Sequence, residues 1–128
     1  MQPLFNVYFH GASGDKILRI IDSGVLQPDD RGGIFLGRYS WESCFMHGGD
    51  LKRRAAFVIK IKIGAADEHI TFFNETPGIR DTAQIQTDRP IAVEIVEMYV
   101  RRIRSDAPAV VDRIAGPVSI KQYLTAAG

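Results

Sequence analysis

The sequence predicts an α+β domain in which mostly antiparallel strands are combined with a few short helices. Apolar residues alternate with other residues along several short segments, most clearly over residues 55–63, and this alternation is typical of strands. Helical spacing of apolar residues is confined to short stretches, of which the clearest covers residues 15–23. The chain has 128 residues, which is enough for one hydrophobic core, so we expect a single domain over residues 1–128.

Each expected element follows from its own local pattern. The first elements are a strand over 5–10, a helix over 15–23 between Ser13 as N-cap and Gly24 as C′ residue, a strand over 34–36, and a helix after Ser40 that stops before Gly48. The later elements are strands over 55–63, 69–73, 83–87 and 93–101, a helix that starts at 105–108 and continues through Val110, Val111 and Ile114, and a last short helix capped by Ser119. Between Ile95 and Val96 the alternation slips by one residue, which predicts a bulge or a turn there.

Composition excludes several classes of protein. The formal net charge is +1, so no global charge attracts nucleic acid. Cys44 is the only cysteine and is expected in the core, while His47 and His69 are expected on the surface; without cysteine pairs or metal-ligand spacing of histidines, we expect no metal site and no disulfide. No apolar run approaches the ~20 residues of a membrane span, and the first residues lack a signal-peptide pattern. We therefore expect no membrane partner and a cytoplasmic location, in the protein's own cell or in a target cell.

A histidine at the end of a strand is the first candidate for function. His10 is followed by Gly11, which permits close approach to the backbone, and Ser13 can donate to an anion at the start of the next helix. Arg31 and Arg38 are candidate ligands for a phosphate, because a guanidinium binds such groups with two parallel hydrogen bonds. The alternative interpretation is structural in each case: a histidine that bonds a backbone carbonyl, and arginines that are solvated.

The order of these elements resembles the opening of the ADP-ribosyltransferase-like family. Its signs are a strand ending in His10-Gly11, a helix ending at Gly24, the strand 34–36 with a small helix behind it, the long strand 57–63, and the segment 83–87 followed by Pro90-Ile91. The resemblance implies two packed, mostly antiparallel sheets around a cleft. Residues 1–104 would form this core, and residues 105–128 would form a C-terminal helical segment.

The resemblance also implies a role for individual residues. In this family the histidine after the first strand bonds a ribose hydroxyl of NAD, and the backbone that follows holds the nicotinamide amide, which assigns these roles to His10 and Gly11. A tyrosine in the next strand stacks on the nicotinamide. Phe35 occupies that position here and keeps the stacking face, and Tyr39 takes the place if the register is shifted.

The third motif of the family is a glutamate beside the bond that breaks. The position that aligns best holds Gln84, which is neutral, and Glu75 and Glu94 are alternatives. A carboxylate stabilises the positive charge that develops on the ribose, and one such electrostatic contribution is commonly ~2.7–4 kcal/mol. Gln84 accepts a hydrogen bond without supplying that charge.

Three functions therefore remain open at this stage. The first is an NAD-dependent ADP-ribosyltransferase-like enzyme, a small toxin or effector that modifies a protein or nucleic acid. An inhibitory protein is a further possible partner of such an enzyme. The catalytic residues of the enzyme would be His10, Gln84 and Tyr39. The second is a metal-independent ribonuclease on the same fold, with His10 as general acid or base. The third is a protein-binding module without chemistry.

Overall fold

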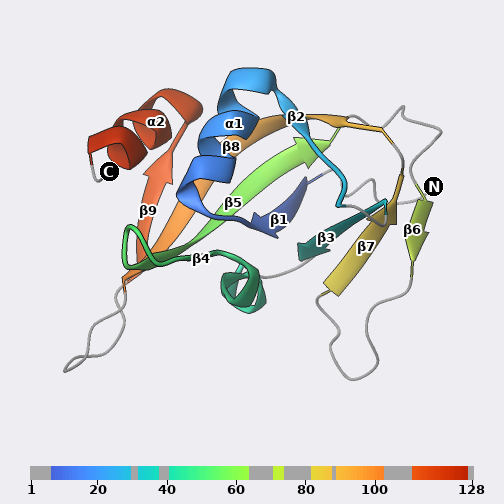
Figure 1. Cartoon of the computed structure of the whole chain (residues 1–128), viewed down its shortest axis with the longest axis horizontal. Coiled ribbons are helices and arrows are strands. Elements are labelled where there is room, and N and C mark those ends of the chain that lie inside the picture. Colours follow the sequence, from blue (N-terminus) through green and yellow to red (C-terminus); the bar gives the residue numbers. More distant parts are fainter. Residues whose placement is uncertain are drawn as a thin grey trace.

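The computed structural model describes residues 7–29, 32–37, 41–63, 71–73, 82–87, 89–102 and 111–126. They form a single domain with a curled antiparallel sheet and two α-helices, which confirms the predicted α+β class (Figure 1). The strands are β1 (Val7–Gly11), β2 (Val25–Leu26), β3 (Gly33–Gly37), β4 (Gly49–Asp50), β5 (Ala55–Ile63), β6 (Thr71–Phe73), β7 (Thr82–Gln86), β8 (Ile91–Arg102) and β9 (Val111–Ala115). The helices are α1 (Gly14–Ser23), the 3₁₀ helix η1 (Glu42–His47) and α2 (Pro117–Ala126).

The sheet has one continuous order of strands, in which the described residues of β1 and β3 pair at one position. The order is β2-β8-β5-β1-β3-β7-β6, with β4 paired to β5 and β9 paired to β8, whereas the family resemblance implied two packed, mostly antiparallel sheets around a cleft. At the joint between β1 and β3, Phe9 and Gly37 are the only paired residues in the described part of the chain. Every residue of β3, in contrast, pairs with β7. The order therefore divides at this joint into two groups of strands.

Helices pack against the sheet through two apolar clusters. Ile17 of α1 and Ile120 and Leu124 of α2 are fully buried in the larger cluster. Figure 1 shows α1 and α2 side by side, and η1 apart from them, next to β1 and β3. Phe45 and Cys44 of η1 are buried in the smaller cluster, which confirms the core position predicted for Cys44. The helix η1 is thus held against the strands that carry His10 and Phe35.

The predicted ends of the first helix are confirmed. Ser13 is its N-cap, and Ser13 Oγ accepts a hydrogen bond of 3.4 Å from the backbone N–H of Lys16. Gly24 ends the helix at φ 74°, a conformation that glycine adopts without strain, and its N–H donates to the carbonyl of Ile20. Because both caps are local, they are readable from the sequence.

The predicted bulge is also confirmed. Lys60 of β5 pairs with Glu97 of β8, and the next residue, Ile61, pairs with Ile95. Val96 is therefore the extra residue that shifts the apolar alternation of β8.

The prediction for the last quarter of the chain is partly wrong. Val111 and Ile114 belong to the strand β9, and not to the helix expected there, because β9 adds to the edge of β8. The last helix begins at Pro117, two residues before the expected cap Ser119. The cap expected at Ser40 falls outside the described residues. Within the described ranges, no helix has the length and apolar character needed to cross a membrane.

Candidate functional site

His10 lies where the strands β1 and β3 separate. Its Nδ1 atom is 2.9 Å from the carbonyl oxygen of Phe35 on β3. A carbonyl oxygen only accepts hydrogen bonds, so Nδ1 must carry the proton and donate it. In the neutral ring this leaves Nε2 with a lone pair that accepts a hydrogen bond or a proton.

The surroundings of His10 favour this neutral form. Burial lowers the pKa of His10 below its ordinary value of 6.5, and the positive charges of Lys16 and His47 act in the same direction. The hydrogen bond to the carbonyl of Phe35 opposes the shift only in part. A neutral imidazole at pH 7 with Nε2 as acceptor suits contact with a hydroxyl group.

The glycines Gly11 and Gly48 fix η1 against the sheet. A Cβ atom on Gly11 would lie 2.1 Å from the carbonyl oxygen of Cys44, and one on Gly48 would lie 1.9 Å from that of Phe57. Both distances are far inside van der Waals contact, so only glycine allows this approach. The sequence attributed Gly11 to close approach of a ligand, whereas in the structure the close neighbour is η1.

Phe35 is half-buried, and its ring contacts a second histidine. The ring centroids of Phe35 and His47 are 4.4 Å apart at an angle of 46°. His47 is exposed, as predicted, but it lies at the site and not on a remote surface. The sequence signal beside it was the pair Gly48-Gly49, which is too short to predict a phosphate-binding loop.

The third predicted position lies on the next strand. Gln84 of β7 is the Cα partner of Phe35 in the β3–β7 ladder. His10, Phe35 and Gln84 therefore come from three neighbouring strands, β1, β3 and β7, although 25 and 49 residues separate them along the chain. Glu94, in contrast, pairs with Lys62 on the far side of β5 from β1, so it is removed from His10.

Several predicted site residues fall outside the described parts of the chain: Arg31, Arg38, Tyr39 and Glu75. Ser13 is described, and its hydroxyl caps α1.

The start of α1 already holds a carboxylate of the chain itself. Asp50 Oδ2 accepts a hydrogen bond of 2.8 Å from the backbone N–H of Gly14 and one of 2.9 Å from Arg53 Nη1. These contacts keep the pKa of Asp50 below its ordinary value, although desolvation alone would raise it. Arg53 Nη2 also donates to Asp15, at 3.0 Å. The backbone donors at this helix start are thus partly used inside the protein, away from any ligand.

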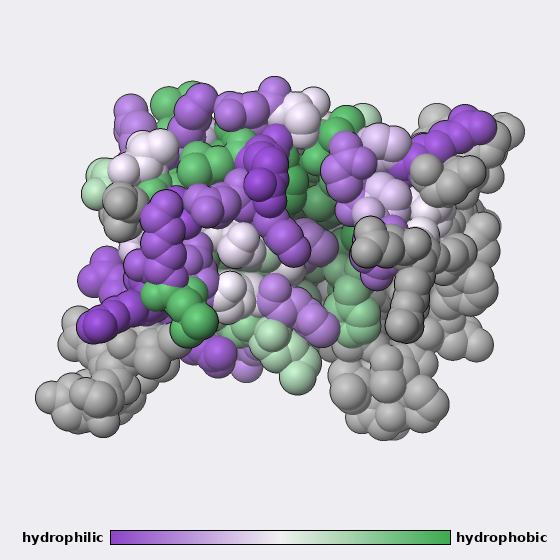
Figure 2. Space-filling view, viewed as in Figure 1, coloured by the Kyte–Doolittle hydropathy of each residue, from purple (hydrophilic) through white to green (hydrophobic). Residues whose placement is uncertain are grey.

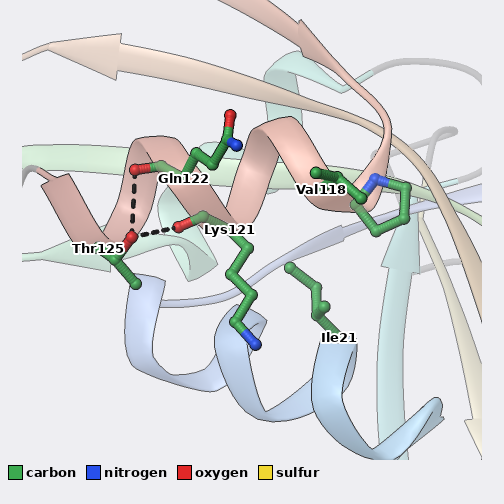
Figure 3. Close-up of a pocket in the computed structure, with 6 residues that line it drawn as sticks. Ile21, Val118, Lys121, Gln122 and Thr125 are labelled. Atoms are coloured by element: carbon green, nitrogen blue, oxygen red, sulfur yellow. Dashed lines mark hydrogen bonds between the residues drawn. The ribbon is translucent and has the colours of Figure 1, made fainter.

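A groove between α1 and α2 lies apart from these residues. Its volume is about 510 Å³, and Figure 3 shows it between Ile21 of α1 and Val118 and Lys121 of α2. Figure 2 shows hydrophobic residues exposed among hydrophilic ones on this side of the molecule. None of His10, Phe35 and Gln84 lines the groove. We therefore assign the candidate site to the joint between β1 and β3, where His10 bonds the carbonyl of Phe35.

Two further findings bear on the kind of site. Among the described residues, no group of three or more His, Cys, Asp or Glu side chains is placed to hold a metal ion. No protein-family model, no curated protein and no solved structure matches this chain.

Proposed function

We propose that this protein is an ADP-ribosyltransferase-like enzyme that binds NAD at the joint between β1 and β3 and modifies a protein or nucleic acid, as a small toxin or effector acting in the cytoplasm. The observation that carries the proposal is the convergence of three positions on neighbouring strands. His10 bonds the Phe35 carbonyl, and Phe35 pairs with Gln84. These are the positions that the family resemblance picks out from their order along the chain.

The chemistry of the donor set fits the nicotinamide end of NAD. His10 offers a neutral ring whose Nε2 would accept a hydrogen bond from a ribose hydroxyl. Phe35 offers a half-buried aromatic ring for stacking against the nicotinamide. NAD itself supplies the bond between nicotinamide and ribose that ADP-ribosyl transfer breaks.

Gln84 limits the rate that this site would support. A neutral amide does not stabilise a positive charge on the ribose as a carboxylate does, and such a contribution is about 2.7–4 kcal/mol, or a hundredfold or more in rate. Glu94 is separated from β1 by β5, so it is a poor substitute. The site is therefore better suited to binding NAD than to fast transfer.

Isothermal titration of the purified protein with NAD tests the proposal. We expect the wild type to bind NAD, and His10→Gln to bind it at least about tenfold more weakly, because the amide keeps an N–H donor for the Phe35 carbonyl and lacks the ring acceptor. Glu94→Gln is the matched control and should bind as the wild type does. Absence of NAD binding by the folded wild type at millimolar concentration would overturn the proposal.

The same proteins test the chemistry through release of nicotinamide. Gln84→Glu should release nicotinamide about a hundredfold faster than the wild type. An unchanged rate in a variant that still binds NAD would show that position 84 does not face the reacting bond.

One observation favours a second function, metal-independent cleavage of RNA. Two imidazoles, those of His10 and His47, both contact Phe35, and paired histidines suit general acid–base catalysis. RNA cleavage in the presence of a chelator, lost in His10→Gln, together with no NAD binding, would select this function.

A further inference from the structure

The sheet has a second face, opposite the one against which α1 and α2 pack. Side chains alternate along a strand, so Tyr99 and Val58 belong to the smaller apolar cluster, whereas their neighbours Met98 and Ile59 belong to the larger one. The helices α1 and α2 contribute to the larger cluster, and η1 contributes to the smaller one. This second face therefore carries its own set of side chains, which the candidate site does not use.

A series of ring contacts crosses this face. Trp41, the N-cap residue of η1, stacks on Tyr99, with ring centroids 5.0 Å apart and ring planes at 14°. Phe45 meets Trp41 edge-on, at 5.5 Å and 80°. Trp41 is only partly buried, and among the described rings none covers its other face. A further flat aromatic ring can therefore extend this stack.

Two arginines lie at the two ends of the series. The guanidinium carbon of Arg101 is 4.6 Å from the centre of the Phe45 ring, and that of Arg113 is 5.5 Å from the centre of the Tyr99 ring. Within the described residues, Arg101 has no ion pair. Arg113 Nε pairs with Glu97 at 3.1 Å, but the Arg113 side chain is 67% exposed and its guanidinium has further N–H donors. The rings hold both guanidiniums on the face while donors are left for an anion.

The charges of this face also favour an anionic partner. Lys60 and Lys62 of β5 stand opposite Glu97 and Glu94 of β8, so opposite charges face each other there. Arg101 instead stands opposite an apolar residue of β9. Among the described side chains of β5, β8 and β9 on this face, cations therefore outnumber acids, because the two arginines come in addition to the lysines.

The three rings and two guanidiniums together are named the stacking platform: Trp41, Phe45, Tyr99, Arg101 and Arg113. We propose that this platform binds single-stranded nucleic acid, with a base stacked on Trp41 and backbone phosphates at the two arginines. Rings that accept bases, beside cations that follow the phosphates, are the combination by which proteins bind single strands. A duplex fits less well, because its bases are already stacked on one another.

The helix η1 connects the platform to the candidate site. Trp41 precedes the first residue of this helix, and His47, its last residue, contacts Phe35. In a 3₁₀ helix these two positions are roughly 12 Å apart along the axis. A strand held on the platform is thus a suitable acceptor for the reaction at the joint between β1 and β3. This last step rests on the proposed function, whereas binding of the strand does not.

The fluorescence of Trp41 tests the platform directly, because Trp41 is the only tryptophan of the chain. The purified protein is titrated with single-stranded DNA and RNA of about ten nucleotides at about 50 mM salt. We expect both strands to quench the fluorescence, since a base stacked on the indole quenches it. A duplex of the same sequence should bind more weakly and quench less.

Neighbouring arginines on opposite faces of β8 provide a matched pair of variants. Arg101→Gln should weaken binding of the single strand at least about tenfold, and should reduce the slope of log affinity against log salt by about 0.7. Arg102→Gln is the control and should bind as the wild type does, because Arg102 lies on the other face and pairs with Asp112 at 3.1 Å.

The role of the ring is tested with a labelled strand, whose fluorescence anisotropy reports binding without tryptophan. Trp41→Leu should weaken binding at least about fivefold, because the stacked base is lost. Trp41→Phe keeps a ring and should bind more tightly than Trp41→Leu. The arginine variants decide the question if Trp41→Leu does not fold.

The outcomes separate this inference from the proposed function. Absence of binding and quenching by both single strands, or equal losses in the two arginine variants, would overturn the platform. Polyglutamate that binds as tightly as the single strands would also overturn it and assign the face to an acidic protein segment. NAD should bind Arg101→Gln as it binds the wild type. Binding of the single strands without binding of NAD would overturn the proposed function and leave the platform standing.

Discussion

At the scale of single residues, His10 has a structural role that is compatible with the proposed chemical one. Its Nδ1–H satisfies the Phe35 carbonyl at the point where the β1–β3 ladder ends. The same bond fixes which nitrogen carries the proton, and burial keeps the ring neutral. The structural interpretation of His10 from its sequence, a histidine bonded to a backbone carbonyl, is therefore confirmed. It is compatible with the proposed functional role, because Nε2 of the neutral ring carries a lone pair.

The lowered pKa of His10 makes stability depend on pH in a defined window. The unfolded chain protonates this histidine near the ordinary value of 6.5, whereas the folded protein resists protonation until lower pH. The contribution of His10 is thus complete above pH 6.5 and is lost as the pH falls through the folded-state value. We expect the free energy of unfolding in urea to fall as the pH is lowered below about 6.5.

His10→Gln is the control, because a glutamine does not titrate and its free energy of unfolding should fall less over this range. Asp50 does not interfere, since its pKa is lowered from 3.8 and its contribution is lost only at more acidic pH. The same slope in wild type and variant would show that another group causes the pH dependence.

At the scale of elements, sequence patterns predicted the features that are marked by local residues. They failed for an element that forms only by pairing with another strand. The caps of α1 and the bulge at Val96 were predicted because one residue marks each. The spacing of Val111 and Ile114 also suits a helix, yet β9 pairs along β8 and places Ile114 opposite Met98. Cross-strand ion pairs, such as Arg102 with Asp112 at 3.1 Å, add to that pairing. A strand that is stabilised mainly by pairing with its neighbour has a weak pattern of apolar residues in its own sequence.

The position of η1 depends on close contact at one glycine, and its neighbour offers a matched control. A methyl group on Gly48 would overlap the carbonyl oxygen of Phe57, whereas one on Gly49 would meet nothing within 4 Å. We expect Gly48→Ala to lower the free energy of unfolding by about 1–3 kcal/mol. Gly49→Ala should change it by less than about 0.5 kcal/mol. Urea unfolding of both variants measures the difference, and equal losses would contradict the close approach of η1.

At the scale of the whole molecule, the fold class and the grouping of His10, Phe35 and Gln84 were predictable, because both follow from the order of elements along the chain. The limited pairing of β1 with β3 could not be predicted from the sequence. Apolar alternation shows which face of a strand is buried, but not how many residues of two strands pair. In place of a second sheet, the group β3-β7-β6 continues the same sheet and joins it through Phe9 and Gly37 in the described part of the chain.

The end of the β1–β3 ladder before His10 predicts unequal stability within one domain. Residues 55–63 of β5 all have partners in β8, whereas the described residues of β3 pair with β1 at one position and accept one bond from the His10 side chain. Burial alone does not separate the two groups, because Leu36 and Ile85 are as fully buried as Ile59 and Met98. We expect the hydrogen-bonded amides of β3 and β7 to exchange at least about tenfold faster than those of β5 and β8, through an opening that costs about 1.4 kcal/mol less. Native-state hydrogen exchange measures this directly. His10→Ala, which removes the bond to the Phe35 carbonyl, should widen the difference, and uniform protection across all four strands would show that the sheet opens only as a whole.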